Sequence, residues 1–223
     1  MNLNKIFNYS LNFDLEKRRK SQIKFLIFHY TGMKKESESI KGLTSVRSKV
    51  SCHYLIKNNG EIVVMVPDLY ISWHAGKSYW KKFKLLNRYS IGIEISNPGH
   101  QHFYKKFNQK QINSILKLTN FLMSKFNLKP KNILGHSDIA PDRKKDPGEK
   151  FIVKKLGIER FNFHQRKTLS INRLLKLYGF SQNYIKIHKP DCIKAVKRSL
   201  NYKTIDSSVS KNFKNKFNNL LFK

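Results

Sequence analysis

The loop of residues 135–148 contains two side chains that could bind a metal ion. His136 follows a short apolar run, and Asp146 lies ten residues further on, directly before Pro147. Prolines restrict the backbone, so Pro141 and Pro147 can hold the two side chains in place. Zinc binds nitrogen and oxygen donors tetrahedrally, and a catalytic zinc site has three protein ligands and one open position for water. The loop therefore predicts two ligands of a zinc site, and a third must come from elsewhere.

The third ligand is expected to be His29. Residues 23–31 are mostly β-branched and aromatic, which is typical of a strand buried within a sheet. His29 closes this strand, and His136 closes the apolar run that precedes it. Open sheets place functional groups just beyond their strand ends, so we expect both histidines to point into one crevice.

Five short sequence blocks follow one another along the chain: His-Tyr-Thr at 29–31, Ser-Cys-His-Tyr-Leu-Ile at 51–56, Trp-His-Ala-Gly at 73–76, Ser-Ile-Gly-Ile-Glu-Ile at 90–95 and the loop at 135–148. In this order they resemble the zinc N-acetylmuramoyl-L-alanine amidases, whose fold also occurs in peptidoglycan recognition proteins. The resemblance covers roughly residues 10–160, and separate blocks in a fixed order form a specific signal. It implies an α/β fold with a central mixed β-sheet flanked by helices.

The resemblance also implies a reaction, the hydrolysis of the amide that joins the lactyl group of N-acetylmuramic acid to L-alanine of the stem peptide. One zinc ion per chain, held by His29, His136 and Asp146, is expected to lower the pKa of a bound water toward ~7 and to polarise the amide carbonyl. In similar amidases a glutamate and a lysine complete the chemistry, and Glu94 and Lys144 stand at these positions here.

Glu94 and Lys144 are the predicted catalytic residues. Glu94 lies between two isoleucines and is expected to carry a proton from the water to the departing amine, with its pKa raised by the apolar neighbours. Lys144, two residues before Asp146, is expected to stabilise the oxyanion. Some branches of the family use a tyrosine just before the histidine of the second strand, but Cys52 stands there and cannot replace the phenol. We therefore assign the base to Glu94 and interpret Cys52 as a small buried side chain.

Five residues are predicted to bind the substrate. Similar amidases line the substrate cleft with the Trp-His-Ala-Gly block, which implies this role for Trp73, His74 and Ala75. For Trp73 the alternative is a plug at the edge of the core. Tyr30 is assigned to the same cleft, and Arg143 is expected either to hold a carboxylate of the stem peptide or to be a solvated loop cation. The remaining histidines we interpret as structural: His53, His100, His102, His164 and His188.

A helix and a hairpin are predicted between residues 33 and 66. Asn-Gly at 59–60 stands between apolar runs, which predicts a hairpin of residues 53–57 and 61–66. Apolar residues at helical spacing predict a helix or helical turns within residues 33–49. The helix would lie beside the site, and its loop would form part of the substrate rim.

A longer helix and an irregular segment are predicted further along the chain. Apolar residues recur at helical spacing within residues 108–127, and Asn108 with Gln111 forms a capping box at the start. Residues 69–89 follow neither period and predict a long loop over the crevice. Residues 171–180 are also expected to be helical.

The chain changes character at about residue 159. No strand-like block follows, and residues 165–223 contain 14 lysines and arginines against 2 acidic residues. We therefore predict a catalytic domain of residues 1–158 and a basic helical module of residues 159–223, which resembles the small three-helix peptidoglycan-binding module of some of these amidases. Removal of the module is expected to spare catalysis. Residues 207–223, rich in Ser, Asn and Lys, are expected to be partly disordered.

The charge of the chain bears on its partners. The 223 residues carry a formal net charge of +31, which attracts polyanions, although solvated surface lysines also account for it. Peptidoglycan fragments or the sacculus are the expected partners, and no nucleic acid is expected. Two alternatives stay open, a peptidoglycan-recognition protein without catalysis and a basic nucleic-acid-binding protein. The presence of all three candidate ligands favours the enzyme.

The expected location follows from what the N-terminus lacks. The chain has no apolar signal region and no apolar run of membrane-spanning length. We therefore expect a cytoplasmic protein without a transmembrane segment, whereas the basic module favours the periplasm or cell envelope as the alternative. Cys52 and Cys192 lie far apart and are not expected to form a disulfide. Nothing in the sequence defines the oligomeric state.

Overall fold

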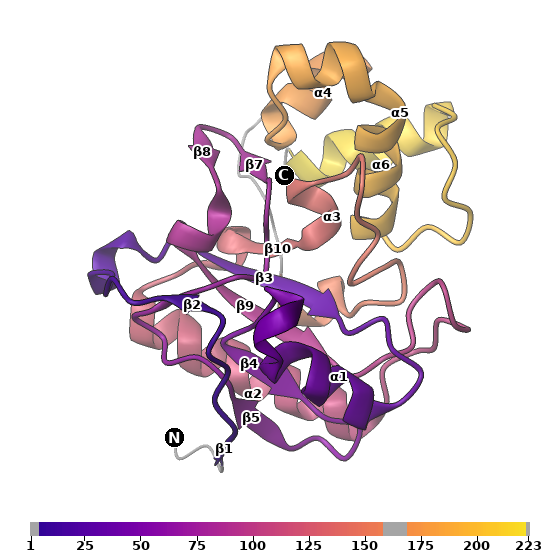
Figure 1. The fold of residues 1–223 in the computed structure, drawn as a ribbon. Coiled ribbons are helices and arrows are strands. Elements are labelled where there is room, and N and C mark those ends of the chain that lie inside the picture. Colours follow the sequence, from indigo (N-terminus) through magenta and orange to yellow (C-terminus); the bar gives the residue numbers. More distant parts are fainter. Residues whose placement is uncertain (1–4, 158–168, 222–223) are drawn as a thin grey trace.

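The fold is built on a six-stranded mixed β-sheet (Figure 1). The computed structural model describes residues 5–157 and 169–221. Neighbouring strands are parallel except for the β4–β5 pair, which is the hairpin predicted around Asn59 and Gly60. The predicted α/β class is confirmed. In order across the sheet the strands are β1 (Lys5–Phe7), β5 (Ile62–Val64), β4 (Tyr54–Ile56), β9 (Ser90–Ile95), β3 (Phe25–Tyr30) and β10 (Ile133–Gly135).

The two central strands, β9 and β3, carry the predicted base and the first predicted ligand on one face. Side chains alternate along β9, so its three isoleucines join one apolar core while the residues between them point the other way. His29 of β3 is paired in register with Glu94 of β9. Residues paired across neighbouring strands lie on the same face of a sheet. His29 and Glu94 are therefore side by side on the face opposite the isoleucines.

Helix α2 (Gln109–Phe126) covers the isoleucine face of the sheet (Figure 1). The side chain of Asn108 accepts a hydrogen bond from the backbone N–H of Gln111 at 3.0 Å. In return the side chain of Gln111 accepts one from the backbone N–H of Asn108 at 3.2 Å. This reciprocal cap confirms the predicted start of the helix. The buried stripe of α2 consists of Ile115, Leu118, Leu122 and Phe126.

Helix α1 (Glu36–Thr44) covers part of the opposite face, over β4 and β5. Leu43 packs there against Leu55 and Val63. The helix lies within the segment for which the sequence predicted helical turns, so that prediction is confirmed.

Three C-terminal helices cover another part of this face, over β3 and β10 (Figure 1). Phe25 and Ile27 of β3 and Leu134 of β10 share one apolar cluster with them. Their order in the chain is α4 (Ile171–Tyr178), α5 (Gln182–Ser199) and α6 (Lys211–Leu221). The helix predicted at residues 171–180 is confirmed as α4.

The structure differs from the sequence analysis at the C-terminal end of the chain. Residues 211–221 form a helix rather than a disordered tail, because Phe213, Phe217 and Leu221 recur on one side and are buried in the shared cluster. The C-terminal helices also supply the apolar cover of β3. The predicted boundary at residues 158–159 and His164 lie outside the described residues, and the division into two domains stays a prediction.

The segment of residues 69–89 is largely irregular, as predicted, but it contains short strands that the sequence did not reveal. The side chain of Trp80 is buried against Tyr178 at a ring-centroid distance of 5.2 Å. Such short strands are held by tertiary contacts rather than by a pattern of their own. The two-residue strands pair antiparallel as β7 (Tyr79–Trp80) with β8 (Phe83–Lys84), and β6 (Ile71–Ser72) with β2 (Phe13–Asp14).

Short helices complete the chain. Helix α3 (His136–Ile139) follows β10 directly and begins at a predicted ligand. No helix in the described ranges is long and apolar enough to cross a membrane. The 3-10 helices are η1 (Lys20–Gln22), η2 (Val46–Ser48), η3 (Leu86–Tyr89), η4 (Pro130–Asn132) and η5 (Val153–Leu156).

Candidate metal centre and active site

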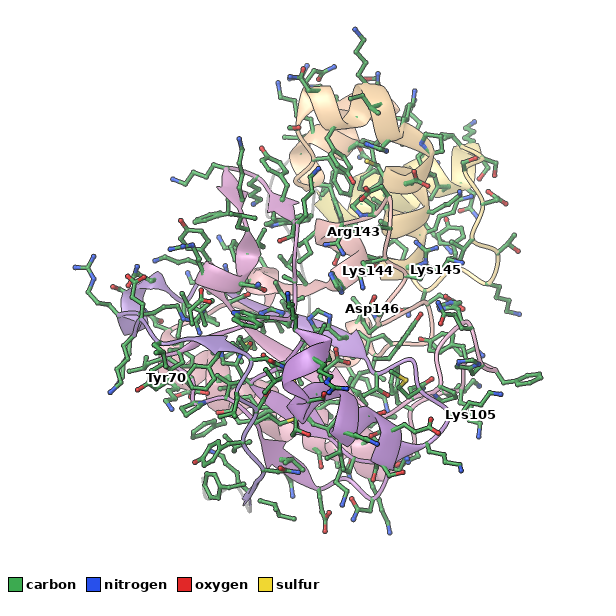
Figure 2. The ribbon with its side chains drawn as sticks, viewed as in Figure 1. Tyr70, Lys105, Arg143, Lys144, Lys145 and Asp146 are labelled. Atoms are coloured by element: carbon green, nitrogen blue, oxygen red, sulfur yellow. The ribbon has the colours of Figure 1, made fainter. Side chains whose placement is uncertain are left out.

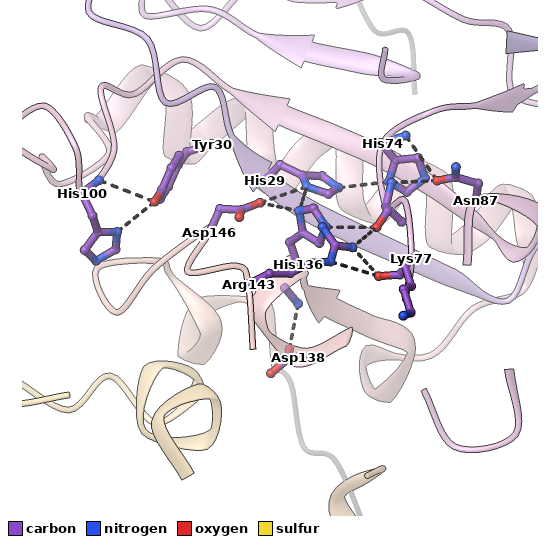
Figure 3. A network of polar contacts seen from close by, with 12 residues as sticks. His29, Tyr30, His74, Lys77, Asn87, His100, His136, Asp138, Arg143 and Asp146 are labelled. Carbon is purple, nitrogen blue, oxygen red and sulfur yellow. Dashed lines mark hydrogen bonds and ion pairs between the residues drawn. The ribbon is translucent and has the colours of Figure 1, made fainter. Parts of the chain in front are cut away.

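Three donor atoms converge at the ends of β3 and β10 (Figure 3). Nδ1 of His29 lies 2.9 Å from Nδ1 of His136 and 3.0 Å from Oδ2 of Asp146. The last two atoms are 2.9 Å apart, and all three side chains are buried. Atoms this close can contact one ion, and two imidazole nitrogens with one carboxylate oxygen suit zinc. The structure therefore brings the three predicted ligands together.

The second ring nitrogen of His29 is held by His74 (Figure 3). His29 donates its Nε2–H to Nδ1 of His74 at 3.0 Å. His74 donates its Nε2–H to Oγ of Ser90 at 3.1 Å, and the Ser90 hydroxyl donates to the carbonyl of Leu86 at 2.6 Å. With the ring protons assigned in this way every donor has an acceptor. Nδ1 of His29 then keeps its lone pair for a metal.

The second ring nitrogen of His136 is held by the backbone. Its Nε2–H donates to the carbonyl of Ala75 at 3.2 Å. The side chain of Asn87 fixes this part of the chain, because its Oδ1 accepts from the backbone N–H of His74 at 3.2 Å and of Ala75 at 2.7 Å. Ala75 therefore acts through its carbonyl. Asn87 belongs to the site although no motif in the sequence marked it.

Burial keeps His29 and His74 neutral. It is the largest cause that lowers the pKa of His29 to about 4, followed by the neighbouring His136. Burial, and then the neighbouring His29, lowers the pKa of His74 well below its ordinary value. Burial alone would raise the pKa of Asp146, but His136 and His29, both hydrogen-bonded to it, hold that pKa well below its usual range. Neutral imidazoles and an ionised carboxylate are the forms that bind a metal.

Glu94 is buried beside His29, and its Oε2 has no hydrogen-bond partner among the described residues. Burial, with a further contribution from the Asp146 carboxylate, raises the pKa of Glu94 to about 8 against the opposing effect of Lys144. A carboxyl group with a pKa near neutrality can both accept and release a proton. These properties fit the proton transfer predicted for Glu94.

The ligands and Glu94 line an open cavity of about 670 Å³. Lys144 lines it as well, and Figure 2 shows its loop between the sheet and the C-terminal helices. His100 and His102, which we interpreted as structural from the sequence, also reach this cavity. All five residues predicted to bind substrate are in its wall: Tyr30, Trp73, His74, Ala75 and Arg143.

Trp73 and Arg143 make internal contacts that the sequence did not predict. The indole N–H of Trp73 donates to Oδ1 of Asp14 at 2.7 Å. Arg143 donates to the carbonyl of Ala75 at 2.7 Å and to that of Lys77. Its guanidinium therefore braces the segment that orients His136. Contact of Trp73 or Arg143 with substrate stays a prediction.

Tyr30 is held at the cavity wall by His100 (Figure 3). The Tyr30 hydroxyl donates to Nδ1 of His100 at 2.9 Å, and His100 donates its Nε2–H to Glu149 at 3.0 Å. Gly99 lies so close to Tyr30 that a Cβ there would come within 2.4 Å of the ring. The aromatic ring is therefore fixed in both position and orientation.

Cys52 has the structural role that we predicted. Cys52 is fully buried, its sulfur lies 3.7 Å from that of Met65, and burial raises the pKa of its thiol well above the ordinary value. Cys192 is a second buried free thiol. The neighbouring His53 is structural as well, because its Nδ1 accepts the backbone N–H of Gly92 at 2.9 Å.

Comparison with known proteins identifies related amidases. The family described as N-acetylmuramoyl-L-alanine amidase matches residues 19–149. The chain is 35% identical over 202 residues to the N-acetylmuramoyl-L-alanine amidase AmiD of Escherichia coli (strain K12), over 75% of this chain and 72% of AmiD. It is 39% identical over 103 residues to the 1,6-anhydro-N-acetylmuramyl-L-alanine amidase AmpD of the same strain, over 46% of this chain and 54% of AmpD.

Solved structures of such amidases are similar over most of the chain. The complex of Escherichia coli AmiD with the substrate anhydro-N-acetylmuramic acid-L-Ala-D-gamma-Glu-L-Lys has a TM-score of 0.76 at 27% identity, covering 93% of this chain and 91% of that one. AmpDh3 from Pseudomonas aeruginosa, in complex with an anhydromuramic pentapeptide, has a TM-score of 0.75 at 25% identity, covering 93% and 92%. The family match, the likeness to AmiD and the site geometry lead to one conclusion. This chain belongs to the N-acetylmuramoyl-L-alanine amidase family and is an enzyme that hydrolyses the amide between N-acetylmuramic acid and L-alanine in peptidoglycan or its fragments.

Proposed function

We propose that this amidase works with one zinc ion held by His29, His136 and Asp146, and that it acts on soluble muropeptides with an anhydro sugar. The observation that carries the metal assignment is the convergence of three buried donor atoms within 3.0 Å of one another. They lie in the wall of a cavity that also contains Glu94 and Lys144. A nitrogen and oxygen donor set beside an open cavity leaves room for water or substrate at the metal.

The substrate assignment rests on the relatives and on the cavity. AmpD is named as an amidase of 1,6-anhydro-N-acetylmuramyl-L-alanine, and the AmiD complex contains an anhydro-muramyl tripeptide. The cavity of about 670 Å³ lies within the size range of small-molecule sites, roughly 300–1,000 Å³. Its wall offers the aromatic rings of Tyr30 and Trp73, whereas His74 and Arg143 are engaged in internal hydrogen bonds. We therefore assign substrate contact first to Tyr30 and Trp73.

The reaction needs one proton to move from water to the leaving amine. When bound, zinc supplies a Lewis acid that polarises the amide carbonyl and lowers the pKa of a water molecule. Glu94 accepts a proton from the attacking water, whose oxygen forms the new bond to the carbonyl carbon. Glu94 then gives that proton to the nitrogen of L-alanine as the C–N bond breaks, because an amide nitrogen leaves poorly without it. Lys144 stabilises the negative charge on the carbonyl oxygen.

The predicted roles of the C-terminal part and of the compartment stay proposals. The positive charge of residues 165–223 supports a contribution to binding of peptidoglycan, in addition to the packing role described above. Fractionation of native cells would test the predicted cytoplasmic location.

Two measurements on the purified chain test the proposal. Elemental analysis should find about one zinc per chain. Chromatography should detect release of the peptide from an anhydro-muramyl tripeptide, which a chelator abolishes and added zinc restores. Hydrolysis that persists in a chain without bound metal would contradict the ligand set. The same assay is run with intact sacculi as substrate. Faster release of peptide from sacculi than from the soluble fragment would contradict the substrate assignment but not the ligand set.

A further inference from the structure

Asp138 is a buried carboxylate two residues after the ligand His136 in helix α3. Its Oδ2 accepts the backbone N–H of Gly135 at 2.8 Å. Its Oδ1 accepts the hydroxyl of Tyr178 at 2.6 Å and that of Ser199 at 2.8 Å. A buried charge is tolerated when such charge-assisted hydrogen bonds replace its water. One carboxylate thus joins the strand end before His136 to two hydroxyl groups from the C-terminal part.

The two hydroxyl groups are themselves fixed, because they belong to two different C-terminal helices. Tyr178 is the last residue of α4 and Ser199 is the last residue of α5. The ring of Tyr178 is fully buried, with its centroid 5.2 Å from that of Trp80 and 5.7 Å from that of Phe217. The position of Asp138 therefore depends on the packing of α4 and α5 against the sheet.

The residues next to His136 also contact the segment that contains Asp146, the second proposed ligand of the loop. The backbone N–H of Ser137 donates to the carbonyl of Asp146 at 2.9 Å. Gly135 lies against Pro147, so closely that a Cβ at Gly135 would come within 2.7 Å of the proline ring. The relative position of His136 and Asp146 is therefore set by the short segment that Asp138 holds.

We propose that Asp138 is a positioning residue, through which Tyr178 and Ser199 hold the His136 segment in the geometry that binds metal. The C-terminal helices then contribute to metal affinity, beyond any contribution to substrate binding. This inference rests on the proposed ligand set. It assigns no contact with substrate or metal to Asp138 itself.

The test compares hydroxyl deletions in the full chain. Tyr178→Phe and Ser199→Ala remove the two hydroxyl groups and leave the apolar packing in place. Zinc affinity is measured by competition with a chelating dye, and ligand geometry by the absorption spectrum of the cobalt(II)-substituted protein. Loss of the hydrogen bonds that orient metal ligands weakens metal binding by roughly 10- to 100-fold. We expect the double variant to bind zinc about 10-fold more weakly than the wild type. The cobalt spectrum should change with it.

Tyr184→Phe is the matched control. Its hydroxyl also joins a C-terminal helix to an aspartate of the same loop, donating to Asp142 at 2.6 Å, but at an exposed position away from the ligands. We expect the control to keep the zinc affinity and cobalt spectrum of the wild type. If the double variant does not fold, the two single variants are measured in its place, each with a smaller expected loss.

The outcomes separate this inference from the proposed function. A wild-type chain that binds zinc, with a folded variant that binds it equally and gives the same cobalt spectrum, overturns the role of Asp138 alone. A lower melting temperature with unchanged zinc affinity also overturns it, because the hydroxyl groups would then serve stability only. A wild-type chain that binds no zinc contradicts the ligand set and the inference together.

Discussion

Nε2 of His29 lies 3.0 Å from Nδ1 of His74, and this contact decides which nitrogen of His29 can bind a metal. The space for His74 is provided by Gly92 on the neighbouring strand. A Cβ at Gly92 would come within 2.3 Å of the His74 ring. A glycine inside a strand often marks such a close approach. The Ser-Ile-Gly-Ile-Glu-Ile block therefore contains both the proposed base, Glu94, and the glycine that makes room for His74, the partner of the proposed ligand His29.

We expect Gly92→Ala to weaken zinc binding about 10-fold or more, although it removes no polar group. The added methyl group would displace His74 and leave His29 without its acceptor. The matched control is Gly42→Ala, where the nearest atom to a new Cβ is 3.9 Å away, an ordinary contact. Dye competition measures both affinities. Equal zinc affinity in the two variants would show that His74 does not position His29.

Glu94→Gln should bind zinc normally and lose most of its turnover. Glutamine has nearly the same shape but cannot accept the proton, and general acid–base catalysis contributes roughly 10²- to 10⁴-fold. Zinc content and kcat on the anhydro-muramyl tripeptide are measured together. Glu61→Gln, at a half-buried position in the turn between β4 and β5, serves as the control. A turnover close to that of the wild type would reassign the base.

Lys144→Ala should lower kcat more than it raises KM, because a lysine that meets charge only in the transition state adds little to substrate binding. A loss of roughly 10²-fold is typical when an oxyanion contact is removed. Lys145→Ala changes the next residue of the same loop, which is more exposed, and should have a much smaller effect. Equal kinetics in the two variants would make Lys144 an ordinary surface lysine.

The raised pKa of Glu94 predicts how stability depends on pH after the metal is removed by a chelator. The pKa of Glu94 is 4.5 for an ordinary glutamate, as in the unfolded chain, and about 8 in the folded chain. The folded chain therefore binds this proton more tightly. Wild-type stability should therefore fall, relative to Glu94→Gln, as the pH rises from about 4.5 to about 8. The difference at the upper end is on the order of a few kcal/mol. Urea unfolding at several pH values measures it, and a difference that does not change with pH would contradict the shift.

Truncation before residue 169 should prevent stable folding, in contrast to what the sequence alone led us to expect. The truncated chain would expose Phe25, Ile27 and Leu134, which the C-terminal helices now cover. It would also leave Asp138 without the hydroxyl groups of its partners. Circular dichroism and gel filtration of the truncated chain test this. A soluble, folded product that binds zinc would instead support the prediction that the C-terminal helices form a separable module.

Local patterns were sufficient for most of the elements that carry the site. The alternation in β9, the capping box at Asn108 and the Asn-Gly turn each depend on neighbouring residues, so they could be recognised without a structure. The candidate ligands His29, His136 and Asp146 were recognised because each closes a strand or lies in a proline-restricted loop. The packing of Cys52 followed from the apolar residues around it.

Contacts between distant segments could not be predicted in this way. Asn87 lies in the short 3-10 helix η3 and His100 in a turn, and only the folded chain brings them to His74 and Tyr30. The hydroxyl of Tyr178 likewise reaches Asp138, 40 positions away in the sequence. Charge and the absence of strands suggested a separate C-terminal unit. In the structure, however, the apolar faces of its helices pack against the sheet as well as against one another.

The order of strands has a consequence for how the chain folds. His29 lies on β3, and its neighbours in the sheet, β9 and β10, are both made much later in the chain. The donor atoms of His29 and Asp146 are separated by 117 positions, so a metal that binds both closes a very long loop. Closing such a loop removes much of the entropy of the unfolded chain. Binding of the proposed zinc would therefore stabilise the folded chain, so that a chelator lowers its stability and a mutation that loosens the sheet lowers metal occupancy.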